Sequence, residues 1–519
     1  MTERAIDVIC LGRAAVDLYG QQIGGRLEDM QTFAKYLGGS SGNLAAGLAR
    51  LGARSAMLTR VGDEQMGRFV REELERLGVD VSHVRTDPDR LTALVILGIG
   101  SGGEIPHIFY RERCADMGLC EDDVNEAFIA SARLLAITGT HTSTPPTLAA
   151  VRRAISYARA NGTCVLLDID YRPVLWGVAH PGDGASRYAE STAATAALQS
   201  LLPDCDVVVG TEEEIAIAGG DPDVITALEN LRRLSDAVVV LKRGAAGCTV
   251  FEPGDIGGLE QGEHMGGFPV EVFNTVGAGD AFLSGFLKAW LDGKPWAACG
   301  RLGNACGALV VARHGCTPAM PSTVELDRFL AMRPTPFRPR LDAELSHLHR
   351  VTTWQDDARP LCVLAFDHRS QFEELAGRHG RSFSDIGHFK RLVAEVLLEV
   401  AGDDGAVRHG AIVDHRHGSD ALNRLSASGL WTASPVEVPG SRPLEFEYQP
   451  ATGAELSTWP AARIAKCLVF YHPDDPAELR HRQEEKLRAL YADLLRQDPR
   501  CSSPALGSVL PVGVAFPPH

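Results

Sequence analysis

Short apolar segments alternate with segments of helical periodicity from residue 5 to residue 313, and this alternation limits the folds that the chain can adopt. It is typical of a largely parallel sheet that is covered by helices on both faces. In such sheets, ligands bind at the carboxyl ends of the strands, where loops 210–214 and 274–279 are expected to converge. The expected strands span 5–11, 55–61, 91–99, 133–138, 163–169, 205–209, 237–242 and 247–251. The expected helices span 41–51, 65–77, 146–160, 187–202, 223–234, 279–292 and 296–313.

The segment 274–282, Asn-Thr-Val-Gly-Ala-Gly-Asp-Ala-Phe, combines two glycines with a carboxylate where a helix is expected to begin. The free N–H groups and the positive dipole end of a helix start form a cradle for phosphate. A phosphate repels a nearby carboxylate, so Asp280 is interpreted as a base that takes a proton from a hydroxyl attacking a phosphoryl group. The same residues also fit a glycine-rich turn before an ordinary amphipathic helix.

Two motifs carry a resemblance to a known family. The first is Gly-Gly-Ser-Ser-Gly-Asn-Leu-Ala at 38–45, which continues to Val-Gly-Asp-Glu-Gln-Met-Gly at 61–67, and the second is 275–282. In this order and at this separation, they make residues 1–325 resemble the ribokinase-like sugar kinases, the pfkB carbohydrate kinases. The resemblance implies a three-layer α/β fold with a mostly parallel sheet, and a small β lid built from parts of 12–36 and 91–113.

The resemblance also implies roles for individual residues around the phosphoryl group and the sugar. Asp280 is expected to be the general base, with the backbone of Gly277, Ala278 and Gly279 forming the anion hole. The residues expected to contact the sugar are Asp17, Gly38, Gly39 and Asn43. A carboxylate at position 17 suits hydroxyl donors. Asn43 also fits the N-cap of a helix.

Two arginines bear on the class of substrate. Arg111 and Arg172 lie in the segments 110–117 and 170–176, which resemble the kinases of the family that act on acid sugars. A neutral sugar needs no cation, whereas a carboxylate matches a guanidinium fork. The expected reaction is phosphorylation of 5-dehydro-2-deoxy-D-gluconate at its 6-hydroxyl, and 2-keto-3-deoxygluconate and fructose are alternative acceptors. Each arginine taken singly also fits an ordinary surface ion pair.

The expected cofactors are ATP and Mg²⁺. Glu213, in Gly-Thr-Glu-Glu at 210–213, takes the place of the family's metal-associated glutamate and is expected to act on Mg²⁺ through water. The residues expected around the nucleotide are Lys242, Gly244, Gly247 and Asn304. Two positions depart from the family pattern, because Asn274 replaces an aspartate and Gly210 an asparagine.

Charge and composition exclude some classes of partner. A net charge of −16 argues against a protein that coats nucleic acid or anionic membranes, since those surfaces are bound by an excess of Lys and Arg. No window offers about eighteen uninterrupted apolar residues, so no transmembrane segment is expected. The twelve cysteines show no metal-type spacing and are expected to be reduced thiols. We expect a cytoplasmic homodimer that binds a small sugar acid and ATP.

The pattern changes after the kinase-like region. Residues 326–354 are rich in proline and arginine and are expected to be a linker. Residues 355–519 resemble a domain of unknown function that is found fused behind kinases of this family, and that domain in turn resembles class I aldolase (β/α) barrels. Because 165 residues are too few for a barrel of about 250, an incomplete domain is expected. This region is interpreted either as an aldolase, with Lys466 as its one candidate Schiff-base lysine, or as a binding or oligomerisation domain. Histidines at 347, 349, 368, 415 and 417 lack a metal-ligand spacing.

Overall fold

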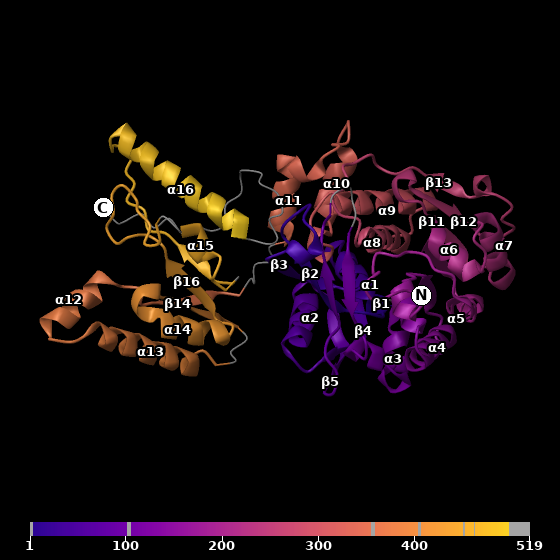
Figure 1. Cartoon of the computed structure of the whole chain (residues 1–519), viewed down its shortest axis with the longest axis horizontal. Coiled ribbons are helices and arrows are strands. Elements are labelled where there is room, and N and C mark those ends of the chain that lie inside the picture. The colour runs from indigo at the N-terminus through magenta and orange to yellow at the C-terminus, as the bar shows by residue number, and fades with distance from the viewer. Residues whose placement is uncertain are drawn as a thin grey trace. The chain divides into compact units, whose positions relative to one another are not determined.

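The computed structural model describes residues 4–100, 105–353, 359–402, 406–449, 452–460 and 462–497. The chain divides into two compact units, Met1–Thr353 and Trp354–His519, and each is described by itself (Figure 1). Within the described ranges, every helix is too short or too polar to traverse a lipid bilayer.

A nine-stranded sheet forms the centre of the first unit, in the order β13-β12-β11-β10-β9-β8-β1-β4-β5. Only β12 runs antiparallel to its two neighbours, so the sheet is mostly parallel as expected. The apolar strands are buried on both faces, which is why their sequences form nearly continuous apolar runs. The strands are β1 (Ile6–Leu11), β4 (Ser55–Gly62), β5 (Asp80–Asp87), β8 (Ala132–Thr138), β9 (Cys164–Asp168), β10 (Val207–Thr211), β11 (Val238–Lys242), β12 (Cys248–Phe251) and β13 (Glu263–Met265).

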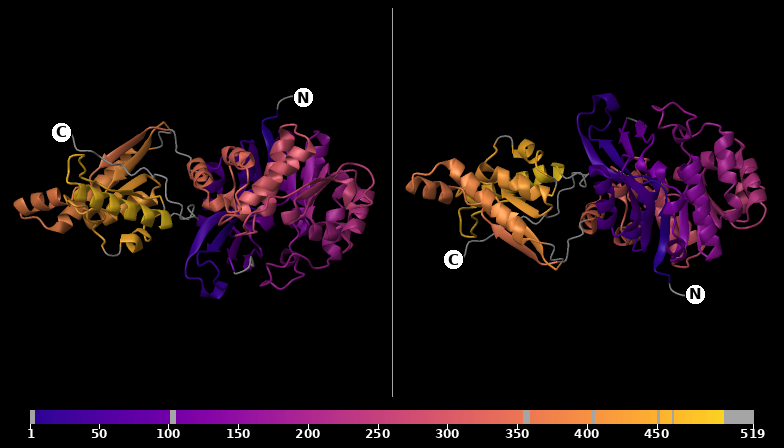
Figure 2. Two further views of the ribbon diagram at one scale, coloured as in Figure 1. Left: turned by 90° about the horizontal axis from the view of Figure 1, so that it is seen from above. Right: turned by 90° about the horizontal axis from the view of Figure 1, so that it is seen from below.

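Helices cover both faces of this sheet and complete three layers (Figures 1 and 2). Each face has its own apolar core. One core packs against α1 (Ser40–Arg50), α2 (Gln65–Arg76), α8 (Ala278–Leu291) and α9 (Trp296–Val311). The other packs against α3 (Glu126–Ala130), α4 (Pro145–Ala160), α5 (Thr192–Gln199), α6 (Glu212–Gly219) and α7 (Val224–Leu234).

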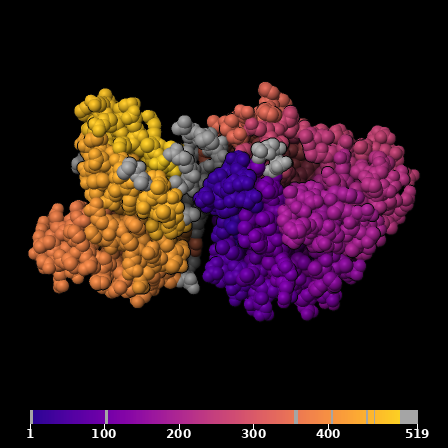
Figure 3. Space-filling view, viewed as in Figure 1, coloured from indigo at the N-terminus to yellow at the C-terminus, as the bar shows by residue number. Residues whose placement is uncertain are grey.

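A second sheet in the same unit is the expected β lid. Its strands are β2 (Ala15–Gly20), β3 (Phe33–Gly38), β6 (Leu94–Leu97) and β7 (His107–Tyr110), in the order β3-β2-β6-β7. Asp17 lies on β2, between Tyr36 of β3 and Val95 of β6. Strands β2 and β3 belong to the indigo surface in Figure 3.

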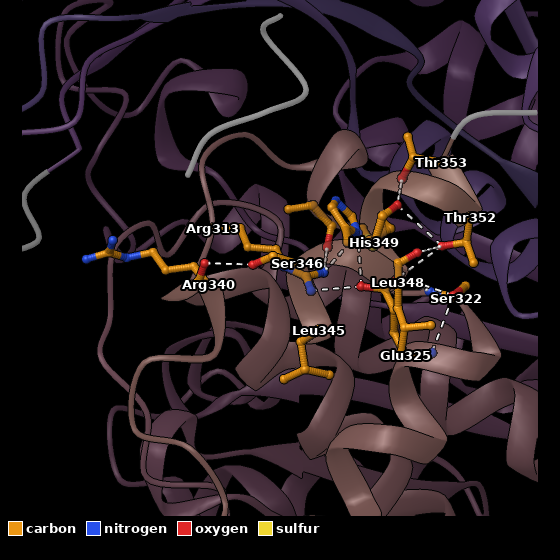
Figure 4. Close-up of polar contacts among 12 residues, drawn as sticks. Arg313, Ser322, Glu325, Arg340, Leu345, Ser346, Leu348, His349, Thr352 and Thr353 are labelled. Atoms are coloured by element: carbon orange, nitrogen blue, oxygen red, sulfur yellow. Dashed lines mark hydrogen bonds and ion pairs between the residues drawn. The ribbon is translucent and has the colours of Figure 1, made fainter. Parts of the chain in front are cut away.

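The stretch expected to be a linker is instead largely helical. It contains most of α10 (Thr323–Ala331) and α11 (Ala343–Thr353), and residues up to Thr353 belong to the first unit. A buried carboxylate fastens α11: Oε1 of Glu325 accepts a hydrogen bond of 2.7 Å from Arg313 and lies 3.0 Å from Nδ1 of His349 (Figure 4). Leu345 of α11 is fully buried beside this network. Proline and arginine content therefore did not identify a linker here, because these residues make tertiary contacts.

The second unit contains four parallel strands in chain order, β14 (Leu361–Ala365), β15 (Arg408–Ile412), β16 (Trp431–Pro435) and β17 (Ile464–Lys466). Consecutive parallel strands joined by helices are the repeat of a (β/α)8 barrel, and four of them correspond to half of one. Its helices are α12 (Ser370–Arg378), α13 (Phe383–Val400), α14 (His415–Ala427), α15 (Thr452–Leu456) and α16 (Ala477–Gln497).

Candidate active site

A cavity of about 480 Å³ lies in the first unit. Its walls come from the lid strands β6 and β7, from the carboxyl ends of β9, β10 and β11, and from the first turns of α1 and α8. Loops 210–214 and 274–279 both contribute to the lining, so their expected convergence is confirmed. A site of this kind, at the carboxyl ends of parallel strands, is where open α/β sheets bind ligands.

Asp280 lies in the first turn of α8 and faces this cavity. Nδ2 of Asn43 donates a hydrogen bond of 2.7 Å to its Oδ2, and Oδ1 of Asn43 accepts one of 2.6 Å from Thr317. Burial and then the charge of Asp170 raise the pKa of Asp280 to about 6, although the bond from Asn43 lowers it. The carboxylate is therefore ionised at neutral pH but can accept a proton. Asn43 is not an N-cap, because α1 begins after Gly39.

The backbone before Asp280 is the segment that was expected to form an anion cradle, and it lines the cavity. Gly277 has φ +81°, and a Cβ there would lie 1.9 Å from Sγ of Cys316, so only glycine fits. A Cβ on Gly279 would meet Nζ of Lys242 at an ordinary 3.5 Å. Asn274 fixes the loop, because its Nδ2 donates to the carbonyl of Gly315 and its Oδ1 accepts from the amide of residue 276. Amides in the first turn of α8 lack intrahelical acceptors and are available to an anion.

Asp17 faces the cavity from the lid and is 4% exposed. Burial raises its pKa to about 7. Gly38 is not part of the lining; a Cβ there would lie 2.1 Å from Cγ of Asp17, so this glycine makes room for the carboxylate. Gly39 does line the cavity, with φ +89°.

The structure separates the two arginines that were expected to bind the acid. Arg172 lines the cavity and lies 3.1 Å from Asp170 and 3.5 Å from Glu214. Arg111 does not line it: its Nε donates a hydrogen bond of 2.7 Å to Asp116, and the whole pair is buried. The expectation that Arg111 contacts substrate is corrected, since its side chain lies outside the cavity lining and its Nε is paired with Asp116, while its two terminal nitrogens are buried without a hydrogen-bond partner.

Acidic side chains face the cavity beside Lys242, whose Nζ lies 3.0 Å from Asp168 and 3.5 Å from Glu214. Desolvation lowers the pKa of Lys242, but Asp168 and Glu214 raise it more, so the lysine is charged. Glu213 also lines the cavity and has no ion-pair partner among the described residues. Within the described ranges no group of three or more acidic, His or Cys side chains is arranged to hold a metal. A carboxylate without an ion-pair partner that faces this cavity nevertheless fits Mg²⁺, which binds through few protein ligands and keeps much of its water.

The remaining residues expected around a nucleotide also line the cavity. Gly244 has φ +55°, with open space where a Cβ would lie. A Cβ on Gly247 would lie 2.0 Å from the carbonyl of Met265. Nδ2 of Asn304 donates to the carbonyls of Met265 and Gly266, so this asparagine shapes the cavity wall.

Several lining residues were not predicted. Arg13 follows β1, Arg187 follows β9, and His107 lies on lid strand β7. Asp168 and Asp170 flank the end of β9, and Asp170 has the unusual φ of +33°. The sequence Asp-Ile-Asp after a buried strand was a usable signal for the two carboxylates. The arginines offered no such signal.

The second unit has its own group of charges beyond the carboxyl ends of its strands. Nζ of Lys466 donates a hydrogen bond of 2.6 Å to Asp367. Lys390 of α13 is fully buried and forms an ion pair with Asp414, and desolvation lowers the pKa of the lysine. Nε2 of His417 lies 2.7 Å from Glu373 rather than in a metal-type cluster.

Comparisons with known proteins agree with this geometry. The model of the "pfkB family carbohydrate kinase" matches residues 5–323, and the model "Uncharacterized protein conserved in bacteria (DUF2090)" matches residues 325–500. The 5-dehydro-2-deoxygluconokinase of Geobacillus kaustophilus is 33% identical, over 63% of this chain and 94% of its own length. That of Halalkalibacterium halodurans is 32% identical, over 63% and 96%.

Solved structures show the same fold. A PfkB protein from Polaromonas has a TM-score of 0.53 at 30% identity, over 62% of this chain and 99% of its own. A putative ribokinase II from Escherichia coli, solved with ATP and Mg²⁺, has a TM-score of 0.55 at 21% identity, over 63% and 99%. The ribokinase-like fold is thereby confirmed for the first unit. The chain belongs to the pfkB family of carbohydrate kinases and is a sugar kinase.

Proposed function

We propose that the kinase transfers the γ-phosphoryl group of ATP to the 6-hydroxyl of 5-dehydro-2-deoxy-D-gluconate, a step of myo-inositol breakdown. The observation that carries the proposal is Asp280, a buried carboxylate with a pKa of about 6, held by Asn43 at the start of α8. The names of relatives that are 33% and 32% identical support this acceptor.

In this mechanism Asp280 accepts the proton of the 6-hydroxyl as its oxygen attacks the γ-phosphorus in line. The amides of Ala278 and Gly279 stabilise the charge that develops on the equatorial oxygens, and Lys242 adds a positive charge nearby. Glu213 would hold Mg²⁺ through water, and the ion would neutralise charge on the phosphates. The lid limits the access of water to the transferred group.

The proposed acceptor is an acid because three arginines, Arg13, Arg172 and Arg187, line the cavity. A ketose without a carboxylate gains nothing from such a cluster. The alternative acceptors are 2-keto-3-deoxygluconate and fructose. An ADP-release assay across keto-deoxy acids and neutral sugars tests the proposal: the highest kcat/KM is expected for 5-dehydro-2-deoxygluconate, and a preference for fructose would contradict it.

A second candidate activity concerns the second unit. Four parallel strands in chain order and a lysine at the end of β17, Lys466 beside Asp367, support an aldolase. The amine would condense with a ketose carbonyl, with loss of water, to form a Schiff base. Borohydride trapping of the kinase product on the full chain tests this activity, with Lys466→Met as the control. Absence of a covalent adduct would exclude it.

A further inference from the structure

Two cations of the cavity, Arg13 and Arg187, have no ion pair among the described residues, and of these two Arg13 also has a buried nitrogen atom without a hydrogen-bond partner. Arg172 is paired with Asp170 and Glu214, and Lys242 with Asp168. Among the described residues, no carboxylate oxygen lies within 4 Å of a guanidinium nitrogen of Arg13. Its Nε is buried without any hydrogen-bond partner.

Arg13 is nevertheless 7% exposed and lines the cavity. Its guanidinium carbon lies 5.3 Å from the ring centroid of Phe109 on lid strand β7, which fixes one face of the plane. A buried cation without a hydrogen-bonded anion is costly in free energy. Such an environment is expected for an arginine whose guanidinium group binds an anionic group of a ligand.

The charged groups near Arg13 bear on which part of a ligand it could bind. Desolvation lowers the pKa of Arg13, as does Arg111, while the charges of Asp170, Asp17 and Asp116 oppose this shift. The pKa of Asp17 responds to both Arg13 and Asp280. Among the cations, Lys242 and Arg172 lower the pKa of Asp280. Arg13 and the proposed base Asp280 therefore both lie within electrostatic reach of Asp17.

We infer that Arg13 binds the carboxylate of the acceptor and thereby determines the specificity of the kinase for an acid sugar. This inference rests on the proposed function and extends it to one residue. An acceptor with its acid group on Arg13 and its middle hydroxyls on Asp17 presents its far hydroxyl to Asp280. In 5-dehydro-2-deoxygluconate, the carboxylate and the 6-hydroxyl are at opposite ends of a six-carbon chain, as this order requires.

The test combines a variant with a change in substrate charge. Wild type, Arg13→Gln and Arg13→Lys are compared on 5-dehydro-2-deoxygluconate and on the analogue with a hydroxymethyl group in place of the carboxylate. Wild type is expected to prefer the acid by roughly 100-fold in kcat/KM, and Arg13→Gln to lose most of that preference through KM. Arg13→Lys keeps the charge without the fork, so an intermediate preference is expected. Arg85→Gln, an exposed arginine of β5, serves as the kinetic control.

Stability distinguishes a binding residue from a structural one. Arg13→Gln removes an unpaired charge, so the melting temperature without ligand is expected to stay equal or rise. Arg111→Gln removes an equally buried arginine that is paired with Asp116, and its melting temperature is expected to fall.

The outcomes separate the two proposals. Undiminished preference for the acid in Arg13→Gln, or in Arg13→Lys should the first variant not fold, would overturn the role of Arg13 alone. A wild type that phosphorylates the analogue as well as the acid would overturn it too. A wild type that phosphorylates neither compound but phosphorylates another sugar would overturn the proposed function as well.

Discussion

The side-chain amide of Asn43 donates a hydrogen bond of 2.7 Å to Oδ2 of Asp280 and so links the first turns of α1 and α8. The hydroxyl group of Thr317 donates a hydrogen bond to Oδ1 of Asn43 and so fixes the orientation of this amide. The two glycine-containing motifs of the family therefore meet at one carboxylate, although they lie more than two hundred residues apart in the sequence.

Replacement of Asn43 by alanine tests this link. The variant is expected to lower kcat roughly 10- to 100-fold, because Asp280, the proposed base, is no longer held in place. The bond from Asn43 lowers the pKa of Asp280, so its loss should move the acidic limb of the pH–rate profile above its wild-type position near pH 6. Asn161→Ala, at the end of α4, is the control. An unchanged acidic limb would contradict the positioning role.

Gly277 and Gly279 provide a matched pair for the anion cradle. Gly277→Ala is expected to destabilise the first unit by about 1–3 kcal/mol, because its Cβ would collide with Cys316 at a positive φ. Gly279→Ala has room for its methyl group, so the melting temperature should hold while the affinity for ATP falls. Thermal denaturation and ATP titration measure the two effects. Unchanged ATP affinity in Gly279→Ala would place the phosphate elsewhere.

The raised pKa of Asp17 leads us to expect that the stability of the first unit depends on pH. Its pKa is raised from 3.8 to about 7 by burial, so ionisation of the native protein is unfavourable. Asp17→Asn should therefore be more stable than wild type at pH 8, by on the order of 2–4 kcal/mol. The gain should vanish below pH 3.8, grow up to about pH 7 and stay constant above it. Urea denaturation across this range checks the sign; a gain that is largest in acid would refute the account.

Glu325 contacts His349 of α11, so its replacement tests how much this contact contributes to the stability of the first unit. Arg313, Arg50 and His349 surround this buried carboxylate, so Glu325→Gln is expected to destabilise the first unit by about 3–5 kcal/mol. Desolvation raises the pKa of Glu325, but the charges of His349 and Arg313 outweigh this effect and hold the pKa below its usual range. The stabilisation is therefore present above the unfolded pKa and is lost in acid. Glu344→Gln, which removes an exposed pair with Arg328, is the control. Equal effects of the two variants would contradict the network in Figure 4.

Much of the first unit could be predicted because its strands and helices have strong periodicity. The expected helix 65–77 is observed as Gln65–Arg76, and the expected strand 237–242 as Val238–Lys242. Strand β5, Asp-Val-Ser-His-Val-Arg-Thr-Asp, was not predicted, because an edge strand is mostly polar. Helix α11 was missed because prolines precede it and its contacts are tertiary.

Site residues that belong to a sequence motif could be predicted. Residues whose role depends on which ion-pair partner the fold brings near them could not. Asp280 and Asn43 stand in motifs, and the structure brings them together. Arg111 and Arg13 look alike in the sequence. Only the folded chain gives Arg111 a partner in Asp116 and leaves Arg13 facing the cavity without one. The choice between an ion pair and a ligand contact depends on neighbours that are distant in sequence.

The most direct measurement is the turnover of Asp280→Asn at pH 8 with saturating ATP and 5-dehydro-2-deoxygluconate. The amide keeps the shape of the carboxylate but cannot accept the proton, so kcat should fall at least roughly 1000-fold while ATP still binds. Turnover close to that of wild type would mean that another group removes the proton, and the catalytic role given to Asp280 would be wrong.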